Sequence, residues 1–197
     1  MCDTCCVLML MRIAPEMFID DRFECVTTIE VKKEIIQTQK FKDKYPWRKK
    51  MKTKIKTLSL SFTTEYKQEY DLVIETINSL LGAGLVNKLT NKPIAVSYVD
   101  KTIAAHAICK ELKITTGDKN LAALVTQEFG IENIFPLGLI NKWLEEKLIS
   151  WNNEHLISWN NEHQTILEDW DKCREAPQPK NDVKRFKQLT GYNYPGP

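Results

Sequence analysis

Apolar residues recur along this chain at helical spacing in some segments and cluster in short β-branched runs in others. Spacings of three and four predict helices over residues 65–90, over Asp100–Leu112 and over Leu121–Phe129. Short runs of β-branched and apolar residues at Lys113–Thr116 and Ile131–Pro136 predict strands. Because strands and helices that alternate through such short connections form βαβ units, the pattern predicts an α/β fold around a parallel sheet.

The N-terminal part of the chain predicts the same alternation. Residues 4–20 are largely apolar and favour a helix, and residues 23–27 predict a short strand. Thr27 or Thr28 then offers a hydroxyl that can cap the start of a following helix, which carries Glu34.

The C-terminal part departs from this alternation. Residues 141–175 favour a helix and contain the octapeptide Leu-Ile-Ser-Trp-Asn-Asn-Glu-His twice, at 148–155 and at 156–163. Since eight residues is not the unit of a helical solenoid, a tandem duplication is a simpler interpretation than a functional repeat. We therefore expect an α/β domain at 1–140 with a basic, partly helical insertion at about 40–92, a helical extension at 141–175 and an extended tail at 176–197.

Two tryptophans of the duplicated octapeptide, Trp151 and Trp159, would lie on nearly one face of a helix. We expect them to be buried against the domain or against a partner chain, and a homodimer is one such arrangement.

Composition narrows the class of protein. Apolar residues make up 43% and charged residues 27% of the 197 positions, which is typical of a soluble globular protein. The chain shows no uncharged apolar run of about 18 residues and no signal peptide, so we expect no membrane span and a cytoplasmic location. In the reducing cytoplasm the six cysteines are expected to be free thiols, and Cys2-x-x-Cys5 supplies only half of a tetrahedral zinc site.

Charge is unevenly distributed, although the net charge is only +2. Residues 40–56 hold nine lysines and arginines against one aspartate, interleaved with aromatic residues. Such a segment can follow a phosphate backbone and stack on bases, so it is a candidate RNA-binding surface; a solvated loop is the alternative interpretation. The candidate contacts are Lys44, Arg48, Lys49, Lys50 and Lys52, with Phe41, Tyr45 and Trp47 as aromatic residues.

Four acids stand where the expected strands end or the expected helices begin: Asp3, Glu34, Asp100 and Asp118. In a parallel α/β sheet, ligands bind beyond the carboxyl ends of the strands, where all four acids could meet. Clustered carboxylates raise one another's pKa unless a cation intervenes. Oxygen ligands favour Mg²⁺ or Mn²⁺, which can activate water for phosphodiester hydrolysis. Taken singly, each acid could instead serve only as a helix cap.

The motifs around these acids resemble those of PIN-domain nucleases, in the same order along the chain. The opening Asp3-Thr-Cys-Cys-Val-Leu is similar to the first motif of the family, and Thr27-Thr-Ile-Glu-Val-Lys-Lys-Glu34 is similar to the second. Ser97-Tyr-Val-Asp100 and Thr115-Thr-Gly-Asp118 are similar to the third and fourth. The resemblance covers roughly residues 1–140.

The resemblance implies a three-layer α/β/α fold with a central parallel sheet, and an endoribonuclease that depends on Mg²⁺ or Mn²⁺. The family includes the VapC-type toxins, so an antitoxin protein is an implied partner beside RNA. In this chain, Asp3, Glu34, Asp100 and Asp118 would form the catalytic acidic quartet, with Asp3, Asp100 and Asp118 as metal ligands.

Thr4 and Thr116 match positions that orient carboxylates or the attacking water in the family, and Glu30 is an alternative fourth acid. Only two residues precede the first acid, where the family has a longer strand. A catalytically weak or inactive PIN-like module that binds RNA or protein is therefore the alternative function. A phosphotransferase with an aspartyl nucleophile is not supported, because no Asp-x-Asp-x-Thr pattern follows a strand.

Overall fold

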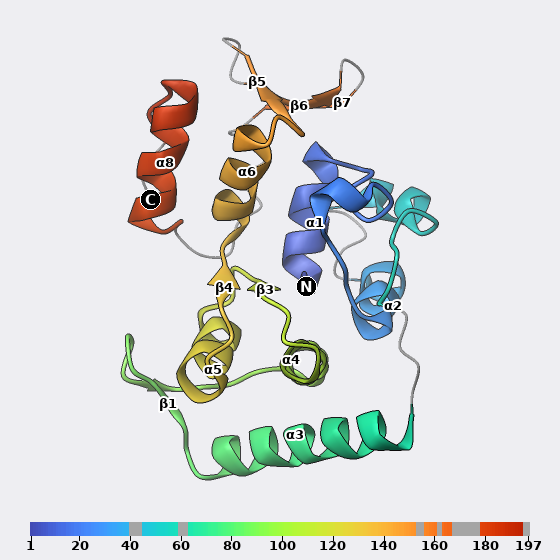
Figure 1. Ribbon diagram of the computed structural model, residues 1–197, viewed down its shortest axis with the longest axis vertical. Helices are drawn as coiled ribbons and strands as arrows, with labels where there is room; N and C mark the ends of the chain where they lie inside the picture. Colours follow the sequence, from blue (N-terminus) through green and yellow to red (C-terminus); the bar gives the residue numbers. More distant parts are fainter. Residues whose placement is uncertain (40–44, 59–62, 153–155, 161–162, 167–177, 195–197) are drawn as a thin grey trace.

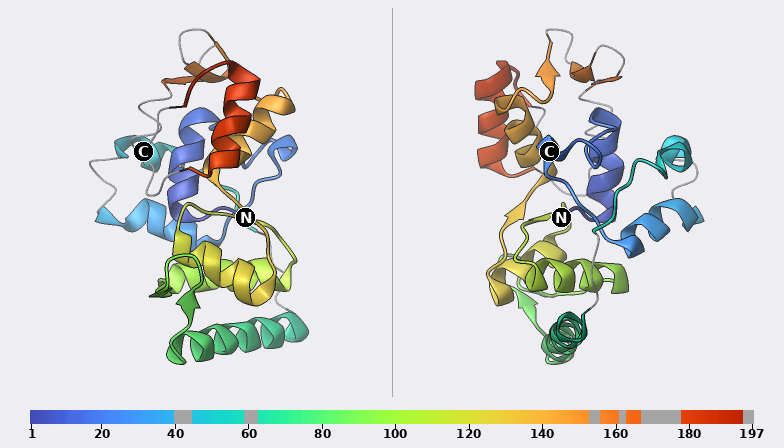
Figure 2. Two further views of the ribbon diagram at one scale, coloured as in Figure 1. Left: turned by 90° about the vertical axis from the view of Figure 1, so that its left-hand side faces the viewer. Right: turned by 45° about the vertical axis from the view of Figure 1, so that its right-hand side comes forward.

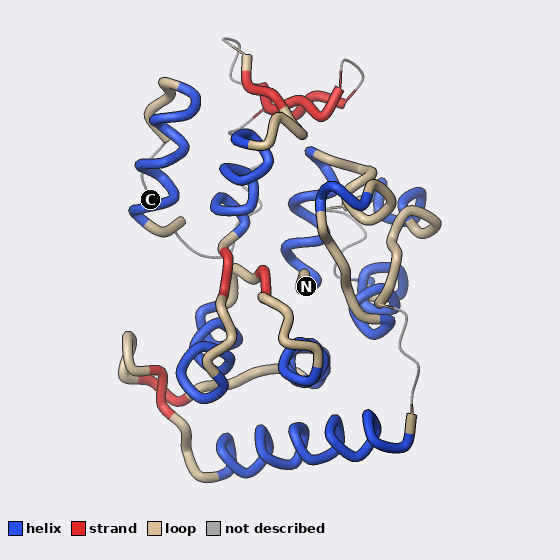
Figure 3. The backbone as a smooth tube through the Cα atoms, in the orientation of Figure 1, coloured by secondary structure: helices blue, strands red, loops and turns tan. Residues whose placement is uncertain are grey.

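The structure is a computed structural model that describes residues 1–39, 45–58, 63–152, 156–160, 163–166 and 178–194 (Figure 1). It is a mixed α/β arrangement, mostly helical with a few short strands (Figure 3). The helices are α1 (Thr4–Ile13), α2 (Ile29–Gln37), α3 (Thr64–Gly82), α4 (Tyr98–Cys109), α5 (Lys119–Phe129), α6 (Pro136–Glu145) and α8 (Lys180–Thr190), with the 3-10 helices η1 (Asp21–Phe23) and η3 (Pro46–Met51). The strands are β1 (Val86–Asn87), β2 (Lys92–Pro93), β3 (Ile114–Thr115), β4 (Asn133–Ile134), β5 (Ser150–Trp151), β6 (Leu156–Asn160) and β7 (His163–Ile166).

Five short segments are joined side by side by backbone contacts. Strand β3 pairs with β4 in parallel, and Cys2 forms a parallel bridge with Thr115. On the other side of the N-terminal segment, the Cys2 N–H donates to the Val26 carbonyl at 2.9 Å, and Thr27 forms a parallel bridge with Thr57. The spatial order of the segments is therefore 133–134, 114–115, 1–3, 26–27 and 57–58.

The first segment is short but is held from both sides. Thr115 donates its N–H to the Met1 carbonyl at 2.7 Å, and Asp3 donates its N–H to the Thr115 carbonyl at 3.2 Å. Together with the bond from Cys2 to Val26, these contacts fix the backbone on which Asp3 stands.

Helices form in the segments predicted at 4–20, 65–90, 100–112 and 121–129, although α1 already ends at Ile13 and α3 at Gly82. The side chain of Asp3 caps α1, Thr28 caps α2, Ser97 caps α4 and Asp118 caps α5 by accepting from free N–H groups of the first turn. The strand predicted at 23–27 is wrong at its start, where η1 forms, and only its end joins the parallel segments.

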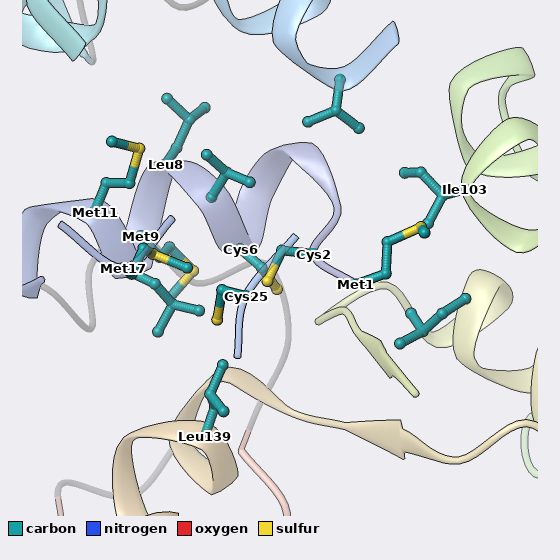
Figure 4. Packing of buried hydrophobic residues seen from close by; sticks show 14 of the residues in the cluster. Met1, Cys2, Cys6, Leu8, Met9, Met11, Met17, Cys25, Ile103 and Leu139 are labelled. Atoms are coloured by element: carbon teal, nitrogen blue, oxygen red, sulfur yellow. The ribbon is translucent and has the colours of Figure 1, made fainter. Parts of the chain in front are cut away.

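Helix α1 is the centre of the core and is buried on nearly all sides. It contacts α2, α6, β6 and β7, and its side chains between Cys6 and Ile13 are buried except for Arg12. Figure 4 shows methionine and cysteine side chains gathered around it, and such flexible, polarisable side chains fill irregular gaps in a core.

The region after α6 differs from the predicted helix. Strands β5, β6 and β7 form an antiparallel sheet in which Ser150 pairs with Ser158, so the two octapeptide copies supply neighbouring strands. Isoleucine, tryptophan and threonine in these strands suit a pleated surface, and pairing between neighbouring segments overrides weak helical periodicity.

The tail also differs from the prediction, because α8 forms within it. Phe186 is fully buried, and its ring makes an edge contact with Trp151 at 5.3 Å between centroids. Gly191 ends the helix in the left-handed conformation that an L side chain rarely adopts. Trp151 thus packs against the chain itself, as predicted, while the side chain of Trp159 lies outside the described residues.

Figure 2 shows the N-terminus between two parts of the molecule, with α1, α6 and α8 on one side and α3, α4 and α5 on the other. Helix α3 packs mainly on α4 at one end, and the β5–β7 sheet lies at the opposite end (Figure 1). Within the described ranges, the helices are too short or too polar to cross a membrane.

Candidate functional site

Asp3 lies at the end of the first parallel segment and at the start of α1. One carboxylate oxygen, Oδ1, accepts the Cys6 N–H at 2.7 Å, and the other, Oδ2, accepts the hydroxyl of Thr116. The side chain is buried, with 4% of the residue exposed. Burial raises the pKa of Asp3 to about 6, although the hydrogen bonds from Thr116 and Cys6 act in the opposite direction.

Thr116 links Asp3 to a second acid. Its Oγ1 atom accepts the Asp118 N–H at 2.9 Å while donating to Asp3, so one hydroxyl touches both positions. Asp118 in turn accepts the N–H groups of Asn120 and Leu121 at 2.6 and 3.1 Å, which is the N-cap of α5. Residues 115 positions apart in the numbering are therefore held through a single side chain.

Thr4 connects the third acid, Glu34, to the start of α1 beside Asp3. Its hydroxyl donates to Oε2 of Glu34 at 2.5 Å, so α1 and α2 are joined beside Asp3. Thr4 is buried, and Glu34 is half-buried on the second turn of α2.

The fourth acid, Asp100, belongs to a capping box at the start of α4. Its Oδ2 accepts the Ser97 N–H at 2.8 Å, and its own N–H donates to Ser97 Oγ at 3.1 Å. Burial raises the pKa of Asp100, and the charges of Asp118 and Glu34 raise it further. The charge of Asp100 likewise adds to the raised pKa of Asp3. The four acids therefore share one electrostatic environment.

The donor atoms suit a hard cation better than a soft one, because they are carboxylate and hydroxyl oxygens. In the part of the chain that the structure describes, however, no three acids, cysteines or histidines are close enough to hold a metal ion together. A Mg²⁺ ion is usually held by one or two carboxylates and several waters, so a site for it does not need three protein ligands.

Glu30, the alternative fourth acid, faces another part of the molecule. Its charge acts on His106 and Tyr70 at the packing of α3 and α4, where the Tyr66 hydroxyl lies 2.7 Å from His106 Nδ1. Burial lowers the pKa of His106. Glu34, which contacts Thr4, therefore suits the quartet better than Glu30.

Asn133 is a supporting residue that the sequence did not indicate. Its Oδ1 accepts the Thr116 N–H at 3.2 Å, and its Nδ2 donates to the Thr116 carbonyl at 3.4 Å. The side chain thus holds the backbone of the threonine that bonds Asp3. An asparagine at a strand start carries no motif, so only the pairing of β3 with β4 shows this role.

The candidate RNA-binding set needs a correction at Arg48. Its side chain is buried and donates to the carbonyls of Ile35, Tyr45 and Thr38 at 2.9, 3.3 and 3.1 Å. A guanidinium with these partners ties η3 to α2 and cannot reach a phosphate.

The other basic candidates divide between exposed and undescribed positions. Lys49, Lys50 and Lys52 are exposed on and after η3, which packs against α2, the helix of Glu34. Lys44 and Phe41 lie outside the described residues. Tyr45 is buried and is not available for stacking, whereas Trp47 is half-buried.

Comparison of the chain with protein-family models, with curated proteins and with solved structures finds no match. The assignment of a function therefore depends on the geometry above and on the resemblance of the four sequence motifs.

Proposed function

We propose that this protein is a metal-dependent endoribonuclease that hydrolyses RNA phosphodiester bonds. The observation that carries the proposal is that Asp3, Glu34, Asp100 and Asp118 share one electrostatic environment. In it, Thr4 bonds Glu34, and Thr116 bonds both Asp3 and the backbone of Asp118. Four acids so far apart in sequence need not meet to serve as helix caps, so their meeting favours a shared ligand.

The order of the parallel segments supports a PIN-like, three-layer arrangement. Numbered along the chain, segments 1–3, 26–27, 57–58, 114–115 and 133–134 lie in the spatial order three, two, one, four, five. In such doubly wound folds, ligands bind where the order reverses, beyond the carboxyl ends of the first and fourth segments. Asp3 and Asp118 follow those two segments.

The protein residues have separate tasks in this proposal. Asp3 and Asp100 would hold Mg²⁺ or Mn²⁺ directly, and Asp118 and Glu34 would complete the site through water molecules. The ion, when bound, supplies charge stabilisation at the phosphate and lowers the pKa of a water molecule. Thr116 keeps the carboxylate of Asp3 in one orientation, and Asn133 keeps Thr116 in place. Lys49, Lys50 and Lys52 would attract the phosphate backbone.

A non-catalytic PIN-like module that binds RNA or a protein is the second candidate. It is favoured by the burial of Asp3, whose carboxylate oxygens both already accept hydrogen bonds, and by the absence of a three-ligand group among the described residues. In either case, an antitoxin-like protein is the partner that the family resemblance suggests.

Cleavage and metal binding should be measured on the same proteins. Purified wild type is incubated with single-stranded RNA in Mg²⁺, Mn²⁺ or EDTA, beside Asp100→Asn and a matched control, Asp71→Asn, which alters an exposed carboxylate on α3. We expect metal-dependent cleavage in the wild type and the control and its loss in Asp100→Asn.

Thermal unfolding gives a second readout that does not depend on activity. A cation that binds only the folded state raises the midpoint of unfolding of the wild type and of Asp71→Asn, and does so less in Asp100→Asn. RNA binding without cleavage, and with no thermal shift from either metal, would favour the non-catalytic module. Equal cleavage by all three proteins would indicate a contaminating nuclease.

A further inference from the structure

Two cysteines on neighbouring segments form a buried thiol pair. The N–H of Cys2 donates to the carbonyl of Val26, the residue that follows Cys25. The Cys25 thiol donates to the Phe23 carbonyl at 3.2 Å, and Figure 4 shows the sulfurs of Cys2, Cys6 and Cys25 grouped beside α1. Adjacent strands lie about 4.8 Å apart, which is within the range of Cα separations that a disulfide spans.

A cavity gives small molecules access to this pair, although both residues are buried. Cys2 and Cys25 line a cavity of about 370 Å³, together with apolar side chains that include Leu112 and Leu139. Lys142 is also part of its lining and forms an ion pair with Glu24 at 2.6 Å. Cys6 is not among the lining residues.

Both members of the pair line the same cavity, so a reagent that enters it can reach either thiol first. Cys6 lies in the same group of sulfurs but does not line the cavity.

We propose that Cys2 and Cys25 are a redox modification site that a small peroxide converts to a reversible disulfide. One of the two sulfurs, as the thiolate, attacks one peroxide oxygen, the O–O bond breaks, and the leaving hydroxide takes a proton to become water. The other sulfur then attacks the sulfenic sulfur, the S–O bond breaks, and the proton of the second thiol leaves with the hydroxyl as a second water. The two thiols together lose two electrons, and one hydrogen peroxide gives two water molecules; a thiol reductant reverses the change.

The position of the pair connects it to the acidic site. Cys2 immediately precedes Asp3, so the disulfide would tie the segment that carries Asp3 to the segment at 25–27. A covalent link between segments that are far apart in sequence restricts the unfolded chain and stabilises the folded one.

Peptide mapping of the full chain tests the proposal without reference to nuclease activity. The reduced protein is treated with hydrogen peroxide, free thiols are alkylated, and tandem mass spectrometry assigns the state of each cysteine. We expect a Cys2–Cys25 linked peptide that dithiothreitol removes, and a rise of several degrees in the unfolding midpoint. Cys5 and Cys109, which do not line the cavity, serve as internal controls and should be alkylated.

Two variants test whether the linked peptide depends on Cys25 and not on the neighbouring Cys6. Cys6→Ser removes a neighbouring buried thiol outside the cavity and should leave the linked peptide unchanged, whereas Cys25→Ser should abolish it and leave Cys2 as a sulfenic acid that dimedone traps. Wild-type protein in which Cys2 and Cys25 stay reduced, oxidise separately, or pair with other cysteines overturns the proposal. If Cys25→Ser fails to fold, the wild-type peptide map decides alone.

Discussion

The hydroxyl of Thr116 donates to the buried carboxylate of Asp3 across a sequence separation of 113 residues. The same oxygen accepts the Asp118 N–H, so this contact joins the first and fourth parallel segments at their carboxyl ends. It is the smallest unit of the candidate site that can be tested by itself.

Replacing Thr116 by valine keeps the shape of the side chain and removes the hydroxyl. We expect the pKa of Asp3 to rise further, because a hydrogen bond that favours the ionised form is lost, and the protein to lose about 1–3 kcal/mol of stability at neutral pH. RNA cleavage should fall at least tenfold. Urea unfolding and cleavage rates measure the two effects.

Thr116→Ser is the matched control for this change, since it keeps the hydroxyl and removes only a methyl group. A valine variant that behaves like the serine variant in both assays would show that the hydrogen bond to Asp3 has no role.

The raised pKa of Asp3 predicts a pH-dependent stability. The ordinary value is 3.8 and the value in the folded protein is about 6, so the folded state holds this proton more tightly than the unfolded state. The stability that the protonated Asp3 contributes to the folded state is present in full below pH 3.8 and is lost as the pH rises through about 6. Ionised Asp3 thus costs about 3 kcal/mol at pH 8 in the absence of a bound cation.

Asp3→Asn should remove this cost. We expect the variant to unfold at higher urea than the wild type at pH 8 in EDTA, and the two to converge at pH 4. Asp71→Asn, which changes an exposed carboxylate, should follow the wild type at both values. A difference between Asp3→Asn and wild type that does not vary with pH would contradict the assignment of the titration to Asp3.

Substitution of Arg48 should change the stability of the protein, whereas substitution of the neighbouring exposed lysines should change RNA binding. Arg48→Met leaves the carbonyls of Ile35 and Thr38 without their donor and should cost about 3 kcal/mol, whereas Lys49→Met changes an exposed side chain and should stay within about 0.5 kcal/mol. Denaturant unfolding measures both.

RNA affinity should depend on the exposed lysines and not on the buried Arg48. Charge reversal of Lys49, Lys50 and Lys52 together should weaken binding and reduce its dependence on salt, because fewer counterions are released. Unchanged affinity and salt dependence in this triple variant would remove the basic segment from the proposed RNA surface.

Local features of the fold were predictable because they depend on near neighbours in the sequence. Thr28, one of the two predicted caps, begins α2; α4 begins two residues before the predicted Asp100, and Gly130 ends α5 in the left-handed conformation. The strands at 114–115 and 133–134 also fall within their predicted runs. In each case a short-range hydrogen bond or a backbone preference is sufficient to set the boundary.

The C-terminal errors have the opposite origin. The octapeptide copies form β5 and β6 because they pair with each other, and α8 forms where Phe186 can be buried beside Trp151. Ser150 pairs with Ser158 and Phe186 packs on Trp151, and helical periodicity within one segment contains neither contact. Arg48 was misplaced for the same reason, because composition counts a buried guanidinium and an exposed one alike.

The sequence by itself indicated Asp3, Asp100 and Asp118 as candidate acids and left the fourth acid open between Glu34 and Glu30. Only the tertiary structure decided that Thr116 bonds Asp3, that Thr4 bonds Glu34 and that Asn133 supports them. The physical reason is that capping and periodicity act within one or two turns of the chain, whereas burial and the sharing of a hydroxyl between distant acids exist only after the parallel segments have come together.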